Sequence, residues 1–371
     1  MDEMNISEDM HLINYLSDDT NYIEEHKTNN LATGEVKLDD QKLLNLKESA
    51  FVMLGITLGS GTLLQPFLIR QLGILGWFGC LILTMSSCSL TATLLAKSTA
   101  RVLDENDTGS LVRDPYQLVT EKSCGRNMRL VLVLLTYFTL LTNCMSMLLL
   151  SSSILSNLIP IPHINDIDTV RVWSTVLVGV LTPITYLGTY AELRLPALLS
   201  VTTGVSSVSL ILVNSLLYRF VFEKPGDFNQ TKIQNADQIF FIPLGTVLFS
   251  AGGAGIAPNI VSVSTSRSQI HKSFIGAFSC AFVGLIVSGI APYLVFGDFA
   301  RSNTVSTFHS VINNGGREHD QIRAFIVITT LIDVIMMLDT CTSIVLLMNP
   351  LFLHMEKMVG IPHGKLIFLI I

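Results

Sequence analysis

Gly59-Ser60-Gly61-Thr62-Leu63-Leu64-Gln65-Pro66-Phe67 interrupts an apolar segment with two glycines and a proline. A second run, Gly252-Gly253-Ala254-Gly255 followed by Pro258, interrupts another apolar segment in the same way. Inside a bilayer, each backbone group that such a break leaves without a partner costs roughly several kcal/mol, so breaks survive only in a protein interior or a watery cavity. Two breaks, each opening one array of spans, predict a ligand site within the membrane.

The composition predicts an all-α polytopic membrane protein. Hydrophobic residues make up 49% of the 371 residues and charged residues only 14%, and the mean hydropathy is +0.54. Apolar windows of about 20 residues, long enough to cross the hydrocarbon, lie at 50–69, 74–96, 130–152, 172–190, 196–218, 240–262, 273–296 and 324–348. A ninth begins at Lys365 but has only six apolar residues before the sequence ends, so we expect a shortened chain of about eight complete spans.

The domain organisation follows from these windows. We expect a disordered cytoplasmic tail at 1–48, a transmembrane domain at 49–349, and a cytoplasmic loop with the start of a ninth span at 350–371. With the N-terminus inside, 15 Lys and Arg fall in inside segments and eight in outside segments, which agrees with the positive-inside rule. The sequon at Asn229 then lies outside, where it can be glycosylated.

The tail also contains an acidic-dileucine string, with Asp39 followed by Leu43 and Leu44. This form is typical of sorting signals that bind endosomal or lysosomal adaptors. Such strings are also frequent by chance, and this one lies close to the membrane.

At both breaks the sequence resembles the amino acid/auxin permease family of amino acid transporters. The run 59–67, continuing to Arg70-Gln71-Leu72-Gly73, resembles its first-helix signature, and 249–260 resembles its sixth helix. The spacing is closest to the vesicular inhibitory amino acid and plant vacuolar transporters. The resemblance runs from about 48 to 350 and implies a LeuT-type fold, in which two inverted repeats surround broken helices 1 and 6. Ala254 departs from the pattern, because many members have His or Gln there.

The resemblance and the chemistry of the breaks together predict a substrate site. Helix N-termini suit a carboxylate and freed carbonyls suit an ammonium group, so an amino acid zwitterion fits between the two breaks. Tyr137 and Asn143 in the third span are further candidates, although hydrogen bonds between helices would explain them equally well. The candidate substrate-binding residues are Thr57, Gly59, Ser60, Gly61, Thr62, Tyr137, Asn143, Ser250, Gly252, Gly253, Ala254 and Gly255.

Asp333 and Asp339 are candidates for coupling transport to an ion. A charge near the membrane midplane costs roughly 3 kcal/mol or more, and a buried carboxyl group can hold a proton near neutral pH. Six residues separate the two, which places them about 120° apart around a helix. One can therefore face the site and the other a neighbouring helix. The alternative is that packing neutralises both, or that they lie nearer the interface.

Small polar residues recur within the spans, as at Ser151-Ser152-Ser153. We interpret them mainly as contacts for close helix packing, with a polar lining of a transport path as the alternative. The cysteines offer no pair in outside loops, so no disulfide is expected.

Several function classes are excluded. The glycine runs lack the Lys-Ser/Thr of a phosphate-binding loop, and the eight His are scattered without metal-ligand spacing. The net charge of −6 and the absence of a basic stripe argue against nucleic acid. An enzyme, a metal site and a cofactor are therefore not expected.

The favoured function is secondary active transport of small neutral amino acids, with H⁺ or Na⁺ as the coupling ion and protons preferred. The alternatives are a truncated, non-transporting amino acid sensor and an unrelated receptor or channel. The membrane would be vacuolar, lysosomal, vesicular or plasma membrane.

Overall fold

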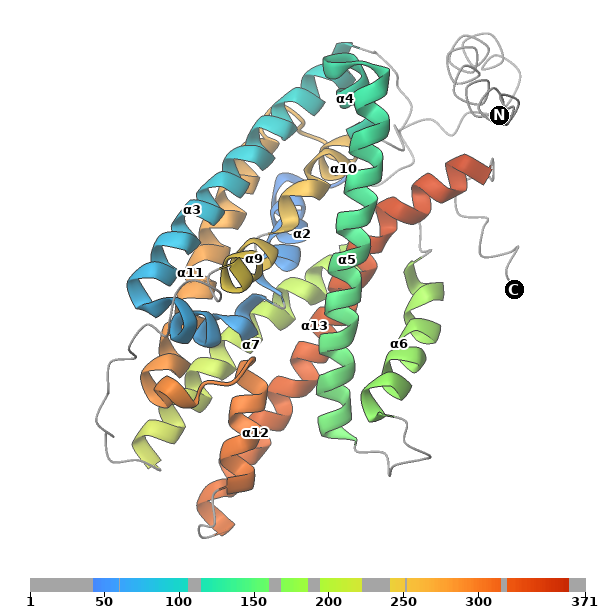
Figure 1. The fold of residues 1–371 in the computed structure, drawn as a ribbon. Helices are drawn as coiled ribbons and strands as arrows, with labels where there is room; N and C mark the ends of the chain where they lie inside the picture. Colours follow the sequence, from blue (N-terminus) through green and yellow to red (C-terminus); the bar gives the residue numbers. More distant parts are fainter. Residues whose placement is uncertain are drawn as a thin grey trace, which may run out of the picture. The chain divides into compact units, whose positions relative to one another are not determined.

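The computed structural model describes residues 43–59, 61–105, 115–159, 168–185, 194–221, 241–250, 252–314 and 319–359 (Figure 1). Ser60, Asn229 and Asp39 lie outside these ranges, as does nearly all of the expected tail.

The described residues are organised into helices, with a single isolated bridge between Leu44 and Ser264. The elements are α2 (Leu46–Leu58), α3 (Gly61–Glu105), α4 (Pro115–Cys124), α5 (Arg126–Leu158), α6 (Thr169–Thr185), α7 (Arg194–Val221), α9 (Phe241–Ser250), η2 (Gly252–Ile256), α10 (Ala257–Ser262), α11 (Ile270–Phe296), η3 (Gly297–Phe299), α12 (Thr304–Asn314) and α13 (His319–Val359). The predicted all-α class is confirmed.

Five of the described helices, α3, α5, α7, α11 and α13, are long and apolar enough to cross a membrane. The pair formed by α9 with η2 and α10 adds a sixth, bent by 45°. Of the remaining two expected spans, 50–69 is interrupted after Leu58, so that α2 has 13 residues. The other, 172–190, is described as far as Thr185, where α6 has 17 residues.

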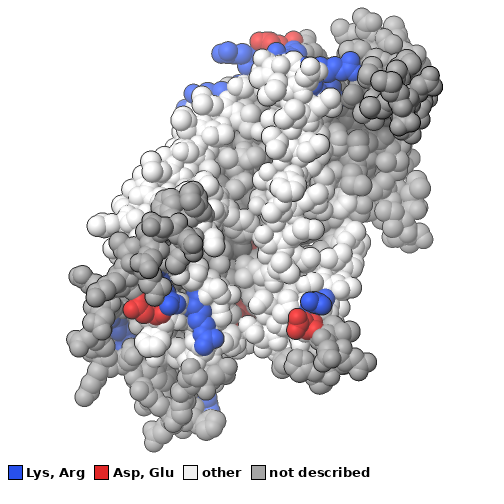
Figure 2. Space-filling model, viewed as in Figure 1, with Lys and Arg blue, Asp and Glu red and all other residues white. Residues whose placement is uncertain are grey.

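Charged side chains gather at the two ends of the bundle. On the face shown in Figure 2, nearly all of the visible charge lies near the top and the bottom, and between them is a broad band with only a little red deep between the helices. Helices α3 and α5 have many exposed apolar side chains, among them Leu83, Leu134 and Phe138. Such a surface is suited to lipid rather than to water.

The bundle is held together by α11 and α13. Helix α11 packs against α3, α2 and α7, whereas α13 (red in Figure 1) packs against α7 and α5. Hydroxyl groups bond between helices, from Ser151 on α5 to Thr340 on α13 at 2.6 Å and from Ser174 on α6 to Ser152 on α5 at 2.8 Å. At these positions the serines form contacts between helices, which agrees with the interpretation that small polar residues serve helix packing.

Gly73 divides α3 into two helical parts, Gly61–Leu72 and 74–105. Its φ of 70° and ψ of 160° lie in a region that only glycine adopts readily. The expected boundary between the first and second spans falls at this residue. The change of direction lets the apolar segment after Gly73 pack along α11.

We therefore predict that Gly73→Ala destabilises the protein by about 1–3 kcal/mol, because the added Cβ strains this backbone conformation. The thermal unfolding midpoint of the purified protein measures the effect. Gly79→Ala is the matched control, since Gly79 is helical and its Cβ would meet no atom within 4 Å. Equal midpoints for the two variants would contradict the prediction.

Candidate functional site

The first break is stabilised by its own side chains. Helix α2 ends at Leu58, and the carbonyl of Gly59 accepts hydrogen bonds from the Thr62 N–H at 3.1 Å and the Thr62 hydroxyl at 3.0 Å. The Gln65 amide donates to the carbonyl of Gly61 at 2.8 Å and accepts from the indole N–H of Trp77 at 2.8 Å. Two carbonyls at the break are thereby satisfied without water.

The second break is a change of helix type. Helix α9 ends at Ser250, and the five residues of η2 form a 3₁₀ turn before α10 begins at Ala257 with Pro258 in its first turn. Proline fits there because the N–H it lacks would have no helical partner.

The two breaks lie against each other. A Cβ placed on Gly61 would come within 3.0 Å of the Cα of Ser250, and one placed on Gly253 would lie 2.7 Å from the Thr57 hydroxyl. Only glycine permits these approaches. A Cβ on Gly252 would lie 3.4 Å from the side-chain nitrogen of Asn143 on α5.

The structure thus brings most of the predicted substrate residues together. The two breaks and Asn143 share one region; Thr57, Gly59, Gly61, Thr62, Ser250 and Gly253 are buried, Asn143 and Ala254 are half-buried, and Gly252 and Gly255 are exposed. Glycines on the open side leave backbone groups accessible to a ligand.

Tyr137 belongs to a neighbouring polar cluster that the sequence did not predict. Its hydroxyl lies 3.5 Å from the side-chain nitrogen of Gln117 on α4, and its ring lies 4.9 Å from that of His354 on α13. The Gln117 nitrogen is also 2.9 Å from Nδ1 of His354. Tyr137 and Gly255 both line a small cavity of about 30 Å³, which connects this cluster to the second break.

Asp339 lies beside the first break. Its side chain is fully buried, and Oδ1 accepts hydrogen bonds from Thr203 at 3.0 Å and Ser200 at 3.2 Å, both on α7. Among the described residues Oδ2 has no hydrogen-bond partner, and it would lie 2.9 Å from a Cβ on Gly59. The hydroxyl of Ser343 is close as well, 3.4 Å from that of Ser200.

These three hydroxyl residues were missed in the sequence. Ser200 and Thr203 are three residues apart, and Asp339 and Ser343 four, so each pair lies on one face of its helix. That spacing could have identified a polar face on each helix, but it does not show which helices face each other.

Asp333 has a different partner. It is fully buried, and its Oδ2 is 2.8 Å from Nε2 of His309 on α12. It therefore faces a neighbouring helix, and the structure does not bring it to the breaks.

The segment before α2 closes one end of the bundle. The Leu44 N–H donates to the Val263 carbonyl at 2.8 Å, and the Thr265 N–H donates to the Leu44 carbonyl at 3.0 Å. Arg194 donates to the Leu43 carbonyl and lies 3.2 Å from Glu48. Leu44 is fully buried, so a sorting adaptor would reach it only after this segment had left the bundle.

A model of the family described as transmembrane amino acid transporter protein matches residues 44–365. The chain belongs to this family. The match begins at Leu44, where the segment that closes the bundle begins, and it includes both breaks. Amino acid transport across a membrane is the activity of the family, and the resemblance found at the breaks is confirmed at that level.

For this transporter we predict that Gly253→Ala lowers the thermal unfolding midpoint, because its Cβ would overlap the Thr57 hydroxyl. Removing that hydroxyl in a Gly253→Ala/Thr57→Ala double variant should recover most of the loss. Gly255→Ala is the control in the same break, since its Cβ would meet no atom within 4 Å. A double variant no more stable than Gly253→Ala would show that the overlap is not the cause.

We also predict that Arg194→Gln loosens the segment at 43–48. Hydrogen exchange of the Leu44 and Thr265 amides should become about tenfold faster, because a charge-assisted hydrogen bond and an ion pair are both lost. Arg171→Gln, which removes only an exposed pair with Asp168 at 3.9 Å, should leave these amides unchanged. Equal exchange rates in both variants would show that the backbone hydrogen bonds of Leu44 alone hold this segment in place.

Proposed function

We propose that the protein is a secondary active transporter that moves small neutral amino acids by alternating access around the two breaks. The observation that supports this most directly is the contact between the breaks, at Gly61 with Ser250 and at Gly253 with Thr57. Family membership supplies the class of substrate, and the chemistry of the breaks supplies the mode of binding.

The broken helices offer complementary charge to a zwitterion. Helix α3 begins at Gly61, so the positive end of its dipole faces the first break and favours the substrate carboxylate. Helices α2 and α9 end at the breaks, where their last carbonyls favour the ammonium group. A polar side chain from Asn143 adds a hydrogen-bonding group from α5.

Substrate size and charge follow from the side chains present. The described residues of the two breaks are Gly, Ala, Ser and Thr, without an ionised group among them. An anionic substrate side chain would therefore lack a counter-charge here, and a cationic one would find its nearest carboxyl group, Asp339, occupied by the coupling proton proposed below. Small neutral amino acids are the best match.

We propose Asp339 as the coupling residue and a proton as the coupling ion. Its unpartnered Oδ2 faces Gly59, and its other oxygen is held by two α7 hydroxyls. Movement of the first break relative to α7 and α13 would change the surroundings of this carboxylate. Protonation and substrate movement are thereby linked through one contact.

The decisive experiment measures uptake of labelled small neutral amino acids into proteoliposomes, with and without an imposed proton gradient. We expect saturable uptake that the gradient increases, and Asp339→Asn should abolish that increase because an amide binds no proton in this range. Asp333→Asn is the matched control, since it is a buried carboxyl group in the same helix that is paired with His309.

The alternatives give different results. If a sodium gradient drives uptake and a proton gradient does not, the coupling ion is sodium and the proposed substrate site still stands. Saturable binding without flux would instead support an amino acid sensor. Loss of gradient dependence in Asp333→Asn alone would move the coupling role to that residue.

A further inference from the structure

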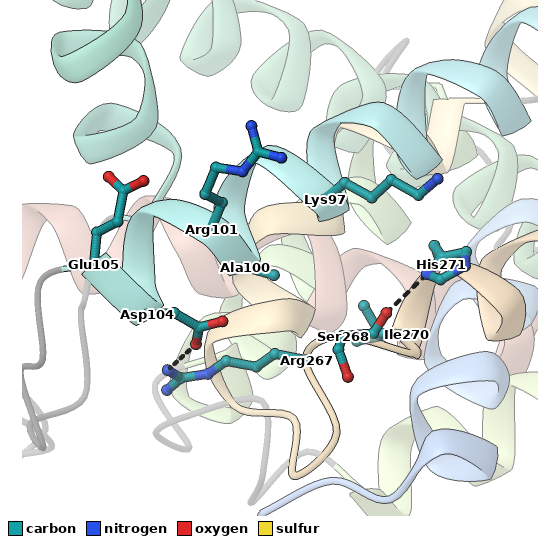
Figure 3. Close-up of a pocket in the computed structure, with 9 residues that line it drawn as sticks. All are labelled: Lys97, Ala100, Arg101, Asp104, Glu105, Arg267, Ser268, Ile270 and His271. Atoms are coloured by element: carbon teal, nitrogen blue, oxygen red, sulfur yellow. Dashed lines mark hydrogen bonds and ion pairs between the residues drawn. The ribbon is translucent and has the colours of Figure 1, made fainter.

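A second, larger cavity lies at the end of α3, away from the breaks. It has a volume of about 520 Å³ and lies between the last turns of α3 and the start of α11 (Figure 3). Its lining residues are Lys97, Ala100, Arg101, Asp104, Glu105, Arg267, Ser268, Ile270 and His271. The volume is in the range of small-ligand sites.

Two cations of this cavity have no partner in the described part of the chain. Lys97 and Arg101 are one turn apart on α3, and both are exposed. Among the described residues neither makes an ion pair or hydrogen bond. Arg267, on the opposite wall, is only loosely paired with Asp104 at 3.8 Å. His271 is fixed by a contact of 3.0 Å between its Nδ1 and the Ser268 carbonyl.

The cavity carries a surplus of positive charge despite its two carboxylates. Its lining has three basic side chains, Lys97, Arg101 and Arg267, against the two acidic ones, Asp104 and Glu105. Asp104 is turned toward Arg267 in Figure 3, whereas Lys97 and Arg101 are directed elsewhere. Lysine and arginine together bind phosphate well, because both donate charge-assisted hydrogen bonds.

The surface next to these cations favours a lipid as the source of the phosphate. Leu90, Leu94, Lys97 and Arg101 recur at spacings of four, three and four residues, so they form one stripe along α3. Leu90 and Leu94 are 60% and 56% exposed. Acyl chains lying along this apolar part of the stripe would bring a headgroup to Lys97 and Arg101.

We propose that this cavity binds the phosphate of an anionic phospholipid headgroup, with Lys97 and Arg101 as its main ligands and Arg267 opposite them. The positive-inside rule assigns this end to the cytoplasmic leaflet, where anionic lipids are concentrated. The site is separate from the substrate region.

The test uses the purified full chain and vesicles of phosphatidylcholine with a minor fraction of phosphatidylinositol bisphosphate. Lipid that remains bound is counted by native mass spectrometry. We expect Lys97→Gln/Arg101→Gln to weaken binding by at least about tenfold, because two charge-assisted hydrogen bonds are lost. Asp104→Asn should strengthen it, because it removes a carboxylate and frees Arg267.

Arg126→Gln is the matched control, since Arg126 is an exposed cation at the start of α5 outside the cavity. The double variant should keep its unfolding midpoint in detergent, because both side chains are exposed and unpaired. Equal binding by the double variant and Arg126→Gln, or weaker binding by Asp104→Asn, would overturn the proposal. Competition by inorganic phosphate as strong as that by the lipid would assign the phosphate to a soluble source.

Discussion

The structure depends on one constraint, which is that backbone groups freed inside the membrane must find partners. At the first break these partners come from nearby residues. Thr62 donates to the Gly59 carbonyl and Gln65 donates to the Gly61 carbonyl, while the indole N–H of Trp77 donates to the amide oxygen of Gln65. These partners consume polar groups that a ligand would otherwise use. What remains available to a substrate is therefore mostly on the second break, where Gly252 and Gly255 are exposed. The asymmetry between the breaks indicates that the second is the more accessible one.

The two broken helices are connected at two levels. At the breaks, glycine permits contact at Gly61 with Ser250 and at Gly253 with Thr57. At the end where α2 begins, Leu44 bonds Val263 and Thr265, which follow α10. A change that separated the breaks would also strain the hydrogen bonds of Leu44. The connector after α10 continues to Arg267 and His271, which line the cavity at the end of α3. One stretch of chain therefore connects the closing segment with a charged surface.

The sequence predicted the features that depend on local backbone chemistry. Glycine and proline spacing located both breaks, because a helix cannot continue through them. Asn143 was a candidate for the site because it is a polar group in an apolar span; in the structure a Cβ on Gly252 would lie 3.4 Å from its side-chain nitrogen, and its role stays a prediction. The contacts of Tyr137 were not predictable, because they depend on α4 carrying Gln117 to a part of α13 near His354. The hydroxyls around Asp339 were missed for a similar reason, because the sequence of neither helix alone shows that α7 packs against α13.

The two carboxyl groups of α13 are six residues apart and therefore have different surroundings. Asp333 lies against His309, and the pair can share one proton and remain compact without any ion from solution. Asp339 is surrounded by hydroxyls, which donate hydrogen bonds but supply no positive charge. A lone carboxylate in such a place costs roughly several kcal/mol unless a proton or a cation accompanies it. On this argument the proposed coupling ion belongs at Asp339 rather than at Asp333. Because Oδ2 of Asp339 faces the backbone of the first break, movement of that break would change the surroundings of the carboxyl group, and this is the physical basis of the proposed coupling.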